Sequence, residues 1–164
     1  MSTGLLILTV VHTAISLVAI GSGFVVLFGM LAGEGLDRWT AFFLTTTILT
    51  SATGFLFPVE KLLPSHVVGI LSLVFLALAL IARYGKHLTG RWRKLYVVTA
   101  VVSLYLNVFV LVAQAFAKVP SLRALAPTQE ETPFKVAQLL VLVLFVYFTV
   151  RALRGFREPA ASPA

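Results

Sequence analysis

The sequence predicts an all-α integral membrane protein: a bundle of five transmembrane helices, amino terminus outside and carboxyl terminus in the cytoplasm. Three observations lead to this fold class. The 164 residues are 59% hydrophobic with a mean hydropathy of +1.00, more apolar surface than a water-soluble domain of this size can bury. Apolar segments long enough to cross a bilayer recur along the chain. Its cations gather in short stretches beside those segments.

A single transmembrane domain is expected over residues 1–157, followed by a polar, disordered tail at 158–164. The five expected spans cover about residues 5–31, 39–57, 66–84, 91–116 and 133–151. Each is apolar enough, and long enough with some tilt, to cross the hydrocarbon layer.

Turn and capping residues mark the ends of these spans. Asp37 is placed to cap the second span, and Pro58 stops it. Thr132 followed by Pro133 is typical of an N-cap and a first helical residue. Residues 118–132, which contain two prolines and the polar run TQEET, are expected to form an ordered surface loop.

The stretch RYGKHLTGRWRK, residues 83–94, orients the chain. It carries five Lys and Arg and no acid between two apolar segments. Short loops this basic stay on the cytoplasmic side of a membrane. With this hairpin inside, nine of the 13 Lys and Arg lie inside and four outside. Arg83 is counted among these loop cations.

Composition weighs against several function classes. The net charge of +7 comes from loop cations and not from a free basic domain, so no nucleic-acid binding is expected. The absence of cysteine excludes disulfides, thiolate metal sites and covalently attached haem. The central part of each span has no charged residue, which disfavours ion-coupled transport. Neither a carboxylate pair nor a nucleophile beside a base is evident, so an enzyme is disfavoured without being excluded.

Polar residues in the apolar segments form the candidate cofactor-binding site. Imidazoles and carboxamides are costly in hydrocarbon unless paired, so they are expected to face the bundle interior. The threading places five of these polar residues in the outer half of the bundle, His12, Thr50, His66, Gln114 and Gln138, and a sixth, Asn107, nearer mid-depth.

Two functions remain open from these residues. One is a binding or redox module whose pocket holds a quinone-like apolar molecule or a b-type haem, with His12 and His66 as iron ligands only if haem is present. The other is a non-catalytic accessory or scaffold subunit, because polar side chains and hydroxyls also lock membrane helices together. The expected partners are membrane lipid, and another membrane protein or a second copy of the chain.

The segments TSATGFLFP, PSHVVGILSL, LYLNVFVLVAQAF and APTQEETPF resemble a group of small bacterial multi-span inner-membrane proteins. The resemblance implies a bacterial inner membrane. That group has no assigned activity, so no residue role is carried over to this chain.

Overall fold

The computed structural model describes residues 3–58 and 64–157, which form helices and connecting turns with no strand in those two ranges. The predicted tail, 158–164, lies outside the described residues. In chain order the elements are α1 (Thr3–Ala32), α2 (Asp37–Gly54), α3 (Pro64–Leu80), the π-helical turn η1 (Ile81–Gly85), α4 (Arg91–Lys118), α5 (Pro120–Leu125) and α6 (Thr132–Gly155).

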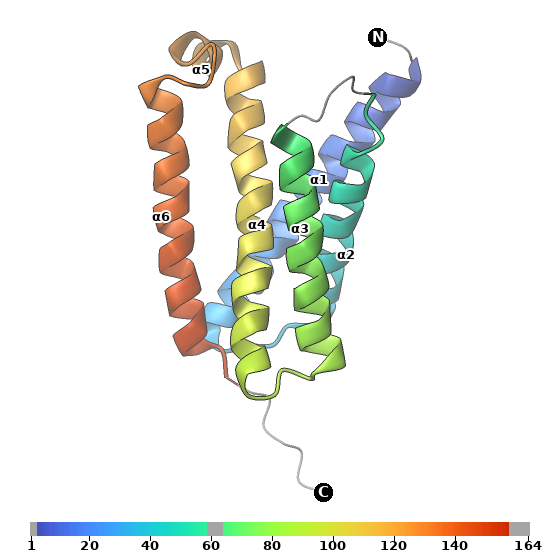
Figure 1. The fold of residues 1–164 in the computed structure, drawn as a ribbon, viewed down its shortest axis with the longest axis vertical. Helices are drawn as coiled ribbons and strands as arrows, with labels where there is room; N and C mark the ends of the chain where they lie inside the picture. The colour runs from blue at the N-terminus through green and yellow to red at the C-terminus, as the bar shows by residue number, and fades with distance from the viewer. Residues whose placement is uncertain (1–2, 59–63, 158–164) are drawn as a thin grey trace, which may run out of the picture.

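The long helices run up and down between two ends of a bundle (Figure 1). We name these ends by what they carry: the hairpin end holds residues 81–94, and the α5 end holds α5. Helix α4 is central, since it packs against α3, α6 and α1. Helix α2 packs along α1 and also contacts α3, and α1 crosses obliquely behind the others.

In the described part of the chain, four helical segments are long and apolar enough to cross a membrane: Thr3–Ala32, His66–Gly85, Arg91–Lys118 and Thr132–Gly155. They make the chain a multi-pass membrane protein. Helix α2 is long enough but is not among them, because Asp37, Arg38 and seven Ser and Thr lower its mean hydropathy.

The structure corrects three details of the sequence prediction. Residues 118–132 are not only loop, because Pro120–Leu125 forms α5, with Pro120 in the first turn, where its missing N–H leaves no bond unmade. Helix α2 ends at Gly54 rather than Phe57. Asp37 is also not its N-cap: Leu36 holds that position, without a side-chain hydrogen bond.

Most of the hydrophobic core lies toward the hairpin end. On α1 the first buried residue is Ala19, and the helix before it is largely exposed. Helices α1, α2 and α4 meet closely at Gly23, where an added Cβ would lie 2.5 Å from the Leu104 side chain and 2.8 Å from that of Phe43. Small residues of this kind let membrane helices approach each other.

The last turn of α1 is closed by a glycine. Gly33 has φ +81°, which glycine adopts without strain. The Glu34 N–H donates to the Gly29 carbonyl at 2.8 Å, and the Gly33 N–H donates to the Met30 carbonyl at 3.2 Å. This is the Schellman pattern that satisfies the final carbonyls of a helix. It directs the following loop toward the start of α2.

Candidate functional site

His12 lies on α1 toward the α5 end, where α2 holds its ring. Its Nδ1 is 2.8 Å from Thr53 Oγ1, and the Phe57 ring meets it edge-on with centroids 5.3 Å apart. The Thr53 hydroxyl has one hydrogen, which the Leu49 carbonyl 2.7 Å away can accept, so the tautomer with its N–H at His12 Nδ1 satisfies both contacts. That tautomer leaves Nε2 as an acceptor on a half-buried ring.

His66 lies in the first turn of α3 and packs against Phe55, with ring centroids 5.6 Å apart. Phe55 directly follows α2. Helix α2 packs against both α1 and α3, whereas α1 and α3 share no substantial packing in the described ranges. The two predicted iron ligands, His12 and His66, therefore lie on helices separated by α2. A bis-histidine haem gains no support from this arrangement.

Asn107 and Thr50 both have hydrogen-bond partners within the bundle. The Asn107 Nδ2 lies 3.4 Å from Thr47 Oγ1, a long hydrogen bond that joins α4 to α2. Thr50 donates to the Thr46 carbonyl of its own helix at 2.9 Å. A hydroxyl bonded back in this way is satisfied without any ligand.

Gln138 lies on α6 and Gln114 on α4. Gln138 is only 9% exposed, and its Nε2 donates to the Phe109 carbonyl at 3.1 Å, which links α6 to α4. Its Oε1 is buried without a partner among the described residues. Gln114 is exposed on α4. The contacts thus distribute the six predicted residues over several helix interfaces and one exposed face, and ligand binding by them stays a prediction.

A buried arginine at the hairpin end is the polar feature that the sequence did not single out. Arg83 lies in η1 and is 8% exposed. The Lys86 N–H bonds to the Ile81 carbonyl at 2.9 Å, five residues back, as in a π-helical turn. Such turns are frequent at functional sites.

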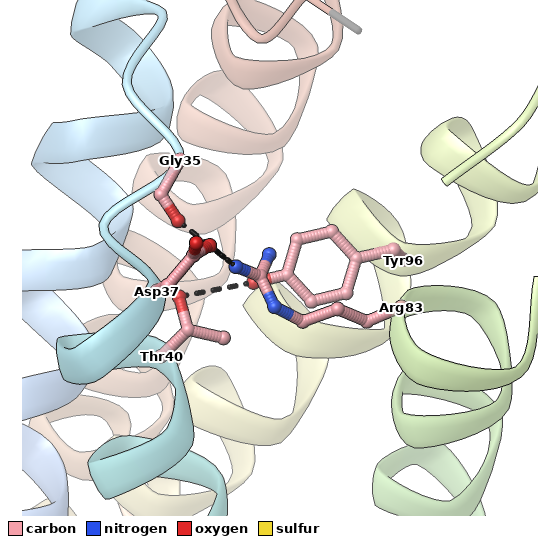
Figure 2. Close-up of polar contacts among 5 residues, drawn as sticks. All are labelled: Gly35, Asp37, Thr40, Arg83 and Tyr96. Atoms are coloured by element: carbon pink, nitrogen blue, oxygen red, sulfur yellow. Dashed lines mark hydrogen bonds and ion pairs between the residues drawn. The ribbon is translucent and has the colours of Figure 1, made fainter. Parts of the chain in front are cut away.

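Figure 2 shows how Arg83 is held. Its Nη2 donates to the Gly35 carbonyl at 3.0 Å and to Asp37 Oδ1. The guanidinium carbon lies 5.2 Å from the centroid of the Tyr96 ring, within the range of a cation–π interaction. The Tyr96 hydroxyl lies 3.4 Å from Thr40 Oγ1. Arg83 therefore ties the end of α3 to the loop before α2 and to α4.

The ion pair between Arg83 and Asp37 is asymmetric. The arginine side chain is 7% exposed, and the aspartate side chain is 91% exposed. Arg83 Nη1 is buried with no hydrogen-bond partner in the part of the chain that is described. A buried donor without a partner costs about 1–3 kcal/mol, and more when it belongs to a charged group.

An open cleft of about 490 Å³ lies beside this arginine. It is lined by Asp37, Arg38, Ala41, Arg83, Tyr84, His87 and Leu88. His87 and Leu88 have positive φ values of 49° and 58°, a backbone region that such residues rarely adopt. Leu88 is buried and its N–H donates to the Ala82 carbonyl at 3.0 Å, which holds this strained loop against the end of α3.

Helical spacing is the sequence signal at Arg83, but it indicates burial only once the structure shows which residues of this helix are buried. Arg83 follows Leu76 and Ala79 at helical steps of seven and four, and both of those residues are buried. Asp37, the acid at the start of the second apolar segment, is the matching charge, and the structure shows that its carboxylate bonds Arg83.

Glu131 organises the loop before α6 at the α5 end. Its carboxylate accepts from the Thr128 hydroxyl at 2.8 Å, the Thr128 N–H at 3.2 Å and the Glu130 N–H at 3.1 Å. Desolvation acts to raise the pKa of this carboxyl, but the hydrogen bonds together outweigh it. The pKa of Glu131 therefore lies below its ordinary value of 4.5.

These features define the class: a helical multi-pass membrane protein with interhelical polar contacts along the bundle and a cationic cleft at one end. Comparison with protein-family models, curated proteins and solved structures found no match for the chain.

Proposed function

We propose that the chain crosses a bacterial inner membrane five times, with its amino terminus outside and its carboxyl terminus in the cytoplasm. Helix α2 is the added span. At 18 residues it is about 27 Å long, close to the thickness of the hydrocarbon layer. Thr46, Thr50 and Thr53 donate to carbonyls of α2 itself, which lowers the cost of placing them in lipid. The basic hairpin supports the orientation.

The absence of cysteine makes this topology directly testable. Lys86 and Lys118 are exposed at opposite ends of the bundle. In the variant Lys118→Cys, we expect a membrane-impermeant maleimide to label intact cells. In Lys86→Cys, we expect labelling only after the cells are permeabilised. The reverse pattern would invert the orientation.

The proposed activity is binding of a small apolar molecule with a hydroxyl donor, a quinol or a related phenol, beside His12. One observation carries this proposal: the hydrogen bond between His12 Nδ1 and Thr53, which orients Nε2 to accept from a ligand hydroxyl. Phe57 supplies an aromatic surface next to the ring. Ligand pockets commonly combine apolar walls with a few well-placed polar groups.

The ligand is tested by extracting purified protein with organic solvent and identifying apolar molecules by mass spectrometry. We expect His12→Ala to lose a co-purifying quinone-like molecule. His87→Ala, which removes an exposed imidazole at the other end of the bundle, should retain it. Equal ligand content in both variants would refute binding at His12. The visible spectrum of the same preparation tests haem, since a Soret band would restore the bis-histidine alternative.

An accessory or scaffold subunit is the second candidate. It is favoured by the hydrogen bonds from Asn107 to Thr47 and from Gln138 to the Phe109 carbonyl, which account for both carboxamides as links between helices. The partner would be another membrane protein or a second copy of the chain. For Asn107→Ala, this function predicts a loss of stability and unchanged ligand content. A ligand-free preparation that migrates as a larger complex in mild detergent would favour it.

A further inference from the structure

The guanidinium of Arg83 has two terminal nitrogens, and the described residues supply hydrogen-bond acceptors to only one of them. Its Nη2 is committed to Gly35 and Asp37, whereas Nη1 is buried without a partner among the described residues (Figure 2). An arginine has only N–H donors to offer, so the missing partner is an oxygen acceptor. Planar guanidinium groups bind phosphate oxygens in a fork geometry.

The cleft that Arg83 lines has a cationic character. Arg38 lines it as well, so two guanidinium groups stand against the single carboxylate of Asp37. Four further cations lie in the adjoining segment, Lys86, Arg91, Arg93 and Lys94. Such a concentration of positive charge at the end of a membrane helix attracts anionic headgroups.

The position of the cleft matches the membrane interface. Arg83 lies in η1, which directly follows the apolar helix α3, so the cleft begins where the hydrocarbon-facing segment ends. Tyr84 and Trp39 are 49% and 47% exposed at this level, as aromatic side chains are at a bilayer surface. Ala41 and Leu88 give the cleft an apolar wall beside its charges.

From these observations we infer that the cleft binds a phosphate group, that of an anionic phospholipid headgroup, between Arg83 and Arg38. Arg83, whose Nη1 has no hydrogen-bond partner among the described residues, supplies one charge, and Arg38 supplies the second. The apolar wall accommodates the glycerol and the first methylenes of the lipid. Because this site lies at the hairpin end, it is independent of the proposed ligand at His12.

The test uses the full-length chain, purified in detergent and stripped of lipid. Its unfolding temperature is measured with added phosphatidylglycerol, with phosphatidylcholine, and with phosphatidylcholine plus inorganic phosphate. A ligand that binds only the folded state raises this temperature in proportion to its occupancy. We expect phosphatidylglycerol to raise it in a saturable manner and phosphatidylcholine to leave it nearly unchanged.

Two matched variants distinguish binding in the cleft from attraction by the general positive charge of the hairpin end. Arg38→Gln removes an exposed cation that lines the cleft, and loss of one charge-assisted hydrogen bond weakens binding roughly tenfold. Arg154→Gln removes an exposed cation of the same end that does not line it, so its affinity should match the wild type.

Three outcomes would overturn the inference. Equal effects of the two phospholipids would remove the anionic site. Equal losses in Arg38→Gln and Arg154→Gln would reduce binding to the general charge of this end. If inorganic phosphate alone reproduced the full shift, the lipid would be wrong and the ligand would be a soluble phosphate.

Discussion

The ion pair of Arg83 and Asp37 leads to a prediction that differs from the usual expectation for a buried residue. We expect replacement of the exposed partner, Asp37→Asn, to destabilise the protein more than replacement of the buried partner, Arg83→Met. The reason is the asymmetry of the pair, with side-chain exposures of 91% for Asp37 and 7% for Arg83. Removing the counter-charge of a buried cation leaves that cation uncompensated.

The magnitudes follow from the contacts. In Asp37→Asn the amide oxygen still accepts from Arg83, so only the charged part of the bond is lost, about 1–2 kcal/mol after solvent screening. Arg83→Met loses two charge-assisted hydrogen bonds of about 2 kcal/mol each and a cation–π contact of about 1 kcal/mol. The same substitution relieves two costs of the folded state. One is the buried Nη1 without a partner, about 1–3 kcal/mol, and the other is the desolvation of the guanidinium charge. These terms nearly cancel, and Asp37 is left in water.

The assay is equilibrium unfolding by added SDS in a zwitterionic detergent without phospholipid, which keeps the proposed lipid site empty. We expect Arg83→Met to unfold within about 1 kcal/mol of the wild type and Asp37→Asn to unfold at lower SDS. In the double variant, the effect of Asp37→Asn should vanish, because its charge partner is gone. A greater loss in Arg83→Met than in Asp37→Asn would refute the reasoning.

Two further predictions concern packing and pH. Gly23→Ala should destabilise the bundle by about 1–3 kcal/mol, because its Cβ would overlap the Leu104 side chain. Gly21→Ala is the control: open space surrounds this position, so the substitution should be neutral or slightly stabilising. SDS unfolding of both variants tests this difference. Glu131 has a lowered pKa in the folded state, so its stabilisation is complete above pH 4.5 and is lost as the pH falls through the folded pKa. Glu131→Gln should flatten this part of the stability profile, measured as unfolding temperature against pH, and an unchanged slope would contradict the role of the Thr128 contacts.

The helices could be predicted from local signals. Helix α4 begins at Arg91, as predicted, and Pro133 lies in the first turn of α6, but Glu131 and not the predicted Thr132 holds the N-cap position. Helix α5 was missed because six residues between two prolines have too little apolar periodicity to indicate a helix.

The predicted convergence of polar residues depended on the order and rotation of the helices, which local patterns do not contain. Asn107 and His12 both face α2, but they meet different residues on it, Thr47 and Thr53. His66 lies beyond α2, against Phe55. A stripe of polar residues predicts that a helix face looks inward, but not which neighbour it meets.

By itself the sequence determined that this is an all-helical membrane protein and where its long apolar helices lie, to within a few residues at their ends. Helical hydrogen bonds join residues four apart, and the preference for lipid follows from composition, so both can be found in short windows. Only the tertiary structure decided that Arg83 is a buried residue and not one more loop cation. Its environment comes from Gly35, Asp37 and Tyr96, which other segments of the chain supply. The packing of those segments is the sum of many weak contacts, which no short window of sequence contains.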